Sequence, residues 1–187
     1  MILPFEGLSA TRLVGLAAYA GAVAGCAWRW RDDRRREGQR RAGNSGVFGV
    51  LAVVQMALLL DIAFNLRWKL HEFFMQGAVS HGLYAMRRQP QRFALFVLGT
   101  FAILGCALIV SRFRRRRGVA LAVAGTSFSV ALRCAEVLSY HDLDAVLYHA
   151  VGGVMLVSLL WAGLTLLTLA GVWIDDRRNT RVANESI

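Results

Sequence analysis

The stretch Phe93–Ser111 reads FALFVLGTFAILGCALIVS and is followed at once by RFRRRR at residues 112–117. No charged side chain interrupts the apolar part, and a helix needs roughly 20 such residues to cross a hydrocarbon core of about 30 Å. The sequence therefore predicts a membrane-spanning helix here. Since basic residues are retained in the cytoplasm, the arginines predict that this helix ends on the cytoplasmic side.

Four other stretches have the same apolar character, and 56% of the 187 residues are hydrophobic. The connections between the stretches are too short to bury a soluble core of their own. We therefore expect a single all-α domain, a bundle of five transmembrane helices at about residues 8–28, 46–66, 93–111, 118–140 and 151–174.

Arginine clusters occupy alternate connections. Seven arginines fall within residues 29–45, five within 112–117 and three within the C-terminal tail 175–187. We expect a flexible loop at 29–45, a poorly ordered tail, an N-terminus outside and a C-terminus inside the bacterial inner (cytoplasmic) membrane. Residues 67–88 and 141–150 then lie outside, and the apolar face of 67–88 predicts an amphipathic helix along the outer surface.

The formal net charge of +10 suits a membrane surface better than a nucleic acid. The basic residues lie beside apolar spans, where lipid phosphates attract them, and no recognition helix, aromatic platform or zinc spacing accompanies them. We therefore expect the lipid bilayer, and no nucleic acid, as the partner.

The first span has two interpretations. Val23–Cys26 matches the cleavage box of bacterial lipoproteins, and cleavage before Cys26 would remove the span. The arginines behind it would then have to cross the membrane, so we expect the span to be retained and keep a lipidated Cys26 as the alternative. Small residues recur in this span and in those at 118–140 and 151–174, which predicts that these three helices make the tightest contacts.

Apart from Arg12 near the start of the first span, three charged side chains lie within the spans, where each costs several kcal/mol unless it is paired or hydrated. Asp61 lies fifteen positions after Gly46, and Arg133 lies fifteen positions after Gly118. At about 1.5 Å per residue the two side chains have the same depth, so we predict an ion pair between them, with Glu136 as a second acceptor. Both a structural pair and a polar site open to the outer face fit this pattern.

Histidines gather on the predicted outer side, together with Asp144. A transmembrane haem would require histidines on facing helices of the bundle core, and no two of them are so placed. We expect no cofactor and keep haem or a divalent metal as the alternative, on His71, His81, His141 and His149.

Guanidinium groups match the oxygens of a phosphate, and their attraction strengthens where water is scarce. The residues expected to bind an anionic ligand are Arg67, Tyr84, Arg87, Arg88 and Arg133. The polar cluster expected around them consists of Asp61, Glu136, His141, Asp144 and His149.

A pattern in small multi-span bacterial membrane proteins of unknown activity resembles three elements of this chain. They are Arg67-Trp68, Tyr84 with Arg87-Arg88 and Gln91, and Arg133…Ser139-x-His141-x-x-Asp144. The resemblance covers about a third of the chain and implies no activity, but it marks Arg67, Arg133, His141 and Asp144 as residues to test.

The expected function is the non-catalytic binding of an anionic lipid head group, or of a partner membrane subunit or second copy, at the outer polar cluster. A membrane-embedded enzyme or a metal- or haem-binding redox protein that uses the histidines is the alternative. A small transporter is the third possibility, which the odd number of spans and the lack of an internal repeat disfavour.

Overall fold

The computed structural model describes residues 9–37, 46–80, 88–114, 116–138 and 140–184. Within these ranges the regular structure is helical except for one pair of short strands, and short turns connect the elements. Five helices are long and apolar enough to cross a membrane: α1 (Ala10–Glu37), α2 (Gly46–Phe64), α4 (Arg88–Arg112), α5 (Arg117–Leu138) and α7 (Leu156–Asn184). The predicted all-α architecture with five membrane helices is therefore confirmed.

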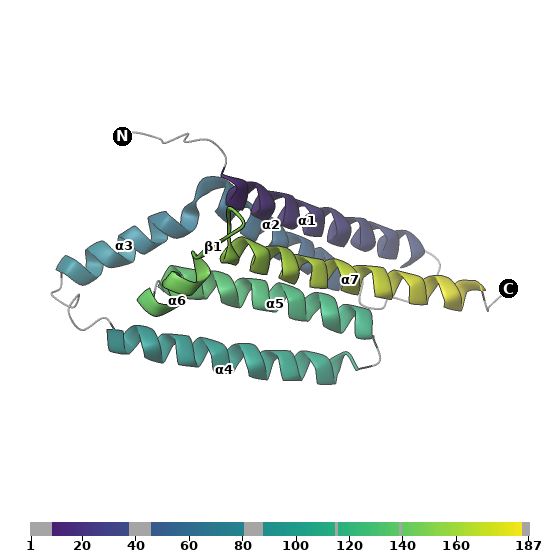
Figure 1. Ribbon diagram of the computed structural model, residues 1–187. Coiled ribbons are helices and arrows are strands. Elements are labelled where there is room, and N and C mark those ends of the chain that lie inside the picture. The colour runs from purple at the N-terminus through teal and green to yellow at the C-terminus, as the bar shows by residue number, and fades with distance from the viewer. Residues whose placement is uncertain (1–8, 38–45, 81–87, 115, 139, 185–187) are drawn as a thin grey trace.

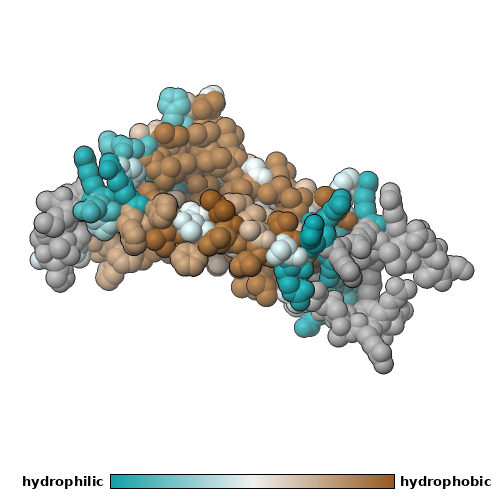
Figure 2. Space-filling model, turned by 90° about the horizontal axis from the view of Figure 1, so that it is seen from below, coloured by the Kyte–Doolittle hydropathy of each residue, from teal (hydrophilic) through white to brown (hydrophobic). Residues whose placement is uncertain are grey.

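The long helices lie side by side and give the bundle two distinct ends (Figure 1). At the hairpin end, α1 begins and the strands β1 (Ala150–Val151) and β2 (Val154–Met155) pair with each other. At the arginine end, α1 and α7 finish and α4 turns into α5. Figure 2 shows a broad apolar belt between these ends, with hydrophilic residues on either side, as expected of a membrane protein.

Four of the long helices form the core of the bundle. α7 packs against both α1 and α5, while α2 packs on α1 and touches α5. α4 lies outside this group and packs mainly on α5, and none of its described side chains is buried. Two apolar clusters fill the core, Tyr19, Leu58, Ile62, Leu147, Val157 and Trp161 in one and Cys26, Phe48, Leu51, Val119, Ala122 and Val172 in the other.

A polar group of three side chains crosses the core. Gln55 is fully buried, and its Nε2 donates to Oγ1 of Thr126 at 2.9 Å and to Oγ1 of Thr168 at 3.5 Å. These contacts tie α2 to α5 and α7. In lipid such bonds hold helices together where the hydrophobic effect cannot.

The closest backbone approach joins α5 and α7. An added Cβ at Gly125 would lie 2.8 Å from the carbonyl oxygen of Leu164 and 2.9 Å from the backbone nitrogen of Thr168. The predicted tight contact between the fourth and fifth spans is confirmed, but the first span packs more extensively on α2 than on α7, so the expectation for all three helices holds only in part. The small residues are there because the backbones leave no room for side chains.

We expect Gly125→Ala to lower the free energy of unfolding by about 1–3 kcal/mol, because the backbone of α7 must move to admit the methyl group. The matched control is Gly163→Ala, since a Cβ at this α7 position meets nothing within 4 Å. Equilibrium unfolding in mixed micelles measures both variants. Equal stability of the two would contradict the close approach.

Three sequence expectations need correction at element ends. The predicted loop at 29–45 begins as helix, because α1 continues to Glu37, and α7 likewise continues to Asn184 instead of ending near residue 174. The last span also begins later than residue 151, because the residues before Leu156 form the hairpin. Gly152 and Gly153 adopt φ values of 60° and 81° in its turn, a conformation that favours glycine.

The connection between α2 and α4 contains α3 (Leu66–Ser80), within the predicted amphipathic segment 67–88. Asn65 has a φ of 52°, and the chain changes direction there, so that α3 leaves the bundle at an angle to α2 (Figure 1). Phe73 and Phe74 on α3 are 70% and 59% exposed. A further short helix that the sequence did not predict, α6 (His141–Leu147), precedes the hairpin.

Candidate functional site

The predicted pair between Asp61 and Arg133 is formed. Nε of Arg133 lies 2.9 Å from Oδ2 of Asp61, and Nη1 of Arg133 donates to Oε2 of Glu136 at 2.8 Å. Nη1 of Arg67 donates to the other oxygen of Glu136 at 2.5 Å. These four side chains, which we term the charge cluster, join α2, α3 and α5 near the hairpin end.

Local structure explains how the charge cluster assembles. Asp61 lies in the last turn of α2, and its Oδ1 accepts the backbone N–H of Arg67 at 2.9 Å across the bend at Asn65. Glu136 follows Arg133 by three positions, which places both side chains on one face of α5. The bend between α2 and α3 therefore brings Arg67 to the face of α5 that carries the pair.

The charge cluster is largely withdrawn from solvent. The side chain of Glu136 is 0% exposed, and those of Arg133 and Asp61 are 9% and 15% exposed. Two guanidinium groups balance two carboxylates, which offsets the cost of burying them. The ring of Trp161 lies beneath both arginines, 4.7 Å from Cζ of Arg133 and 5.4 Å from Cζ of Arg67.

A cleft of about 960 Å³ opens next to the charge cluster, between α3, α4 and α5. We term it the α3–α4 cleft. Its charged lining consists of Arg67, Lys69 and Arg133 against the single carboxylate Asp61. Its remaining lining is apolar apart from the thiol of Cys134: Leu66, Leu70, Phe73, Ala94, Val97, Leu98, Phe101, Cys134, Val137 and Leu138. The cleft therefore combines apolar walls with an excess of positive charge on one side.

The other predicted site residues are not part of this cluster. Arg88 is exposed at the start of α4, His141 is exposed at the start of α6, and His149 is exposed behind α6. Asp144 is half-buried within α6. Three further residues that the sequence predicted for a site lie outside the described residues: Tyr84, Arg87 and His81.

The histidines do not form a metal centre in the part of the chain that the structure describes. There, no three His, Cys, Asp or Glu side chains come together in a way that could hold a metal ion. His71 instead turns toward α5, where its Nδ1 lies 3.4 Å from the carbonyl oxygen of Val137.

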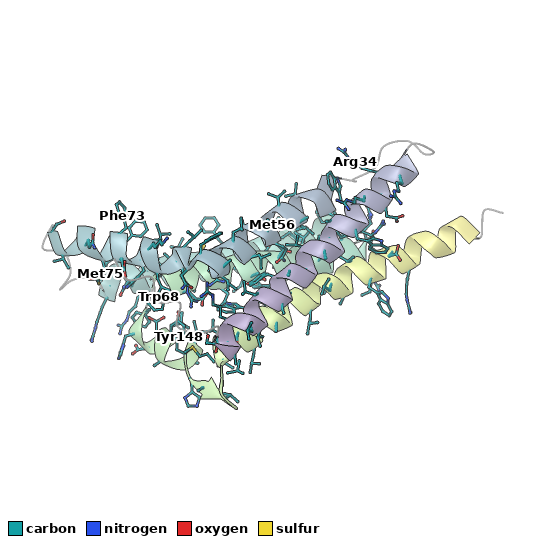
Figure 3. The ribbon with its side chains drawn as sticks, turned by 90° about the horizontal axis from the view of Figure 1, so that it is seen from above. Arg34, Met56, Trp68, Phe73, Met75 and Tyr148 are labelled. Atoms are coloured by element: carbon teal, nitrogen blue, oxygen red, sulfur yellow. The ribbon has the colours of Figure 1, made fainter. Side chains whose placement is uncertain are left out.

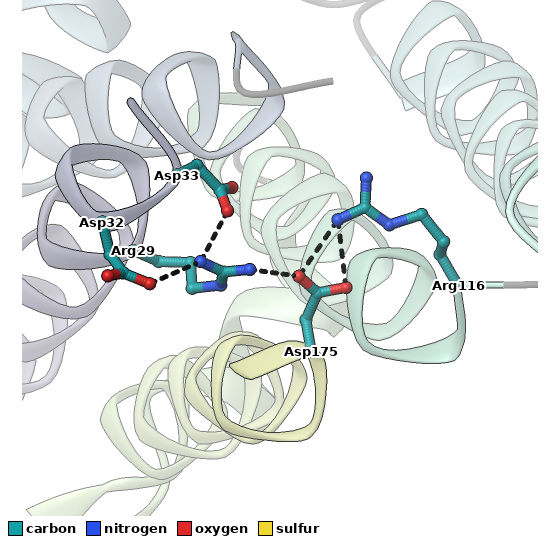
Figure 4. A network of polar contacts seen from close by, with 5 residues as sticks. All are labelled: Arg29, Asp32, Asp33, Arg116 and Asp175. Atoms are coloured by element: carbon teal, nitrogen blue, oxygen red, sulfur yellow. Dashed lines mark hydrogen bonds and ion pairs between the residues drawn. The ribbon is translucent and has the colours of Figure 1, made fainter. Parts of the chain in front are cut away.

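A second buried charge cluster, which sequence reasoning missed, lies at the arginine end (Figure 4). The guanidinium of Arg29 is 0% exposed and lies 3.1, 2.6 and 3.0 Å from carboxylate oxygens of Asp32, Asp33 and Asp175, in that order. Arg116 also reaches Asp175, at 3.1 Å. This network ties α1, α5 and α7 together, and the spacing of Asp32 and Asp33 after Arg29 was the signal available in the sequence.

No family model, characterised protein or solved structure matches the chain. The function is therefore inferred from the contacts and charges of the chain itself.

Proposed function

We propose that this chain is a bacterial inner-membrane protein that binds an anionic lipid, without catalysis, in the α3–α4 cleft. In this proposal the hairpin end faces away from the cytoplasm. The lipid head group lies against the positive side of the cleft, and its chain lies along the apolar walls.

The observation that carries the proposal is the composition of the cleft lining. Asp61 and the buried Glu136 already balance Arg67 and Arg133, so the surplus positive charge of the lining comes from Lys69. A guanidinium or ammonium group in a site with little water attracts a phosphate or carboxylate more strongly than it does in solution. The surplus therefore favours an anionic head group over a zwitterionic one.

The apolar walls favour a lipid over a water-soluble anion. α3 and α4 contribute Phe73, Val97 and Phe101 to the cleft, and the outward side of α4 is apolar as well. Because α4 packs mainly on α5, the cleft lies at the side of the bundle, where the bilayer surrounds it. The volume of about 960 Å³ also falls at the upper end of the range for small-ligand sites.

The distribution of arginines supports the proposed orientation. Arg29, Arg31, Arg34 and Arg116 lie at the arginine end, opposite the cleft. Basic residues next to membrane spans favour the cytoplasmic side. The cleft would then open in the half of the bilayer that faces away from the cytoplasm.

We expect Val97→Trp to reduce the anionic lipid retained by the purified protein about tenfold, because the indole fills the cleft from α4. The variant should still fold, since no described side chain of α4 is buried. Val110→Trp is the matched control: Val110 lies on the same helix, is 50% exposed and does not line the cleft. Native mass spectrometry from nanodiscs of mixed lipid composition measures the retained lipid.

Substitutions of Lys69 test the charge of the cleft separately from its shape. Lys69→Glu should remove the preference for anionic over zwitterionic lipid, whereas Lys69→Gln should only weaken it. Equal lipid retention by the Val97 and Val110 variants would overturn the proposal. A stoichiometric protein subunit in the α3–α4 cleft in place of lipid would also overturn it. That result would instead support the hypothesis that the cleft binds a partner membrane protein.

A further inference from the structure

A second cavity, of about 520 Å³, lies at the hairpin end on another side of the charge cluster. It is lined by Ser9, Thr11, Arg12, Ile62, Asn65, Arg67, Trp68, Tyr148, Met155 and Trp161. We term it the hairpin pocket. In contrast to the α3–α4 cleft, it is bounded by the start of α1, the bend between α2 and α3, and the hairpin, and α4 takes no part in it.

The charge in the hairpin pocket is positive and only partly compensated. Two arginines line it, and among the residues that the structure describes no carboxylate does. Arg67 already binds Glu136, but among the described residues Arg12 has no acidic partner: its Nη2 donates to the carbonyl oxygen of Ala63 at 2.5 Å. The Nε of Arg12 is buried with no hydrogen-bond partner among the described groups. A buried N–H group of this kind favours an acceptor that completes its bonding.

Aromatic rings form one wall of the pocket. Trp68 and Tyr148 point toward each other near the start of α1 (Figure 3), and their rings stack with centroids 6.4 Å apart. Burial raises the pKa of the Tyr148 phenol above its ordinary value, so at neutral pH the hydroxyl keeps its proton and can donate a hydrogen bond. Together with Trp161, these rings offer an apolar surface beside the cations.

The walls are fixed by local hydrogen bonds. Oγ of Ser9 accepts the backbone N–H of Arg12 at 3.3 Å, which is the pattern of a helix N-cap. Oγ1 of Thr11 accepts the backbone N–H of Met155 at 3.1 Å and so ties the start of α1 to the hairpin. A pocket whose walls are held in place in the free protein loses less entropy when a ligand binds.

We propose that the hairpin pocket binds the phosphate or carboxylate group of an organic anion, with Arg12 as the main cationic contact and the aromatic wall against the rest of the molecule. A volume of about 520 Å³ exceeds that of an inorganic ion and lies within the range of small-molecule sites. The anion is either a soluble compound or the head group of a lipid. This inference does not depend on occupancy of the α3–α4 cleft.

The test uses the full chain in nanodiscs of zwitterionic lipid, with phenyl phosphate as the soluble probe and phosphatidic acid as the lipid probe. Binding is followed by tryptophan fluorescence and by the rise in unfolding temperature. If phenyl phosphate binds saturably, the source is soluble. If only phosphatidic acid within the nanodisc stabilises the protein, and it does so equally in the Val97→Trp variant, the source is a head group. Either result supports an anion site, provided that the variants below respond.

Ser9→Asp is the decisive variant, because aspartate caps a helix as well as serine does but brings a negative charge next to Arg12. We expect it to weaken binding by about tenfold or more, while Ser9→Asn, an equally good cap without charge, stays within about twofold. Arg12→Gln should weaken binding by a similar factor. Val97→Trp, which acts on the α3–α4 cleft, should leave the binding of phenyl phosphate unchanged.

Failure of both probes to bind the unmodified protein would overturn the proposal. Equal binding by the aspartate and asparagine variants would also overturn it, since the charge of the pocket would then be irrelevant. Loss of lipid from the α3–α4 cleft in the Val97 variant with retained binding here would separate the two sites.

Discussion

Replacing Arg29 with methionine is expected to lower the free energy of unfolding by about 3–5 kcal/mol, the usual result when one partner of a buried ion pair is removed. The guanidinium is 0% exposed and lies within 3.1 Å of carboxylates of Asp32, Asp33 and Asp175. Without it, Asp175 keeps only the partly exposed Arg116, and Asp33 loses the guanidinium that lies 2.6 Å from it. The connection between α1 and α7 should therefore loosen.

Equilibrium unfolding in mixed micelles measures this loss. Arg31→Met is the matched control, because it removes the same charge from an exposed position two residues away. Adding Asp175→Asn to the Arg29 variant should restore part of the stability, since one buried carboxylate is no longer left unpaired. A loss below about 1 kcal/mol, equal to that of the control, would show that the network is solvated and contributes little.

The second large effect is expected at the other end of the bundle. Arg133→Met should also cost about 3–5 kcal/mol, because Arg133 contacts both Asp61 and Glu136 from within the bundle. Arg67 would still pair with Glu136, but Asp61 would retain only its bond from the backbone N–H of Arg67. Arg67 alone would then connect the bend between α2 and α3 to the charged face of α5.

A double-mutant cycle distinguishes this loss from a packing defect. Asp61→Asn combined with Arg133→Met should be more stable than Arg133→Met alone, because the unpaired carboxylate is gone. Arg88→Met, at an exposed position at the start of α4, should change the stability by less than about 0.5 kcal/mol. If the double variant were no more stable than the single one, the ion pair between Asp61 and Arg133 would carry no coupling energy.

The sequence predicted the spans and one ion pair because both follow from simple periodic geometry. The length of an apolar run decides whether it can cross a membrane, and a constant rise per residue places Asp61 and Arg133 at one depth. Their contact, and that of Glu136, is found as predicted. Arg67 was expected among the anion-binding residues, but its bond to Glu136 was not foreseen, because it depends on the bend at Asn65.

The features that the sequence did not reveal depend on contacts between distant segments. Arg29 was assigned to a solvated loop because arginines near a span ordinarily set its orientation, and nothing in the sequence locates Asp175 beside it. Gln55 is a single amide within an apolar run of the sequence, and only the packing of α2 on α5 and α7 brings it against Thr126 and Thr168. Arg12 lies near the start of the first span, and only the packing of the hairpin encloses it in a pocket.

The peripheral position of α4 has a consequence for how ligands move. Its described side chains are all at least partly accessible and it packs mainly on α5, so lipid chains can replace most of what it would lose by swinging outward. Such a movement costs less than disrupting the helices around α7, as local opening generally costs less than global unfolding. If the α3–α4 cleft holds a lipid as proposed, an outward movement of α4 would widen the space beside α3 directly into the bilayer, and the lipid would exchange without passing through water.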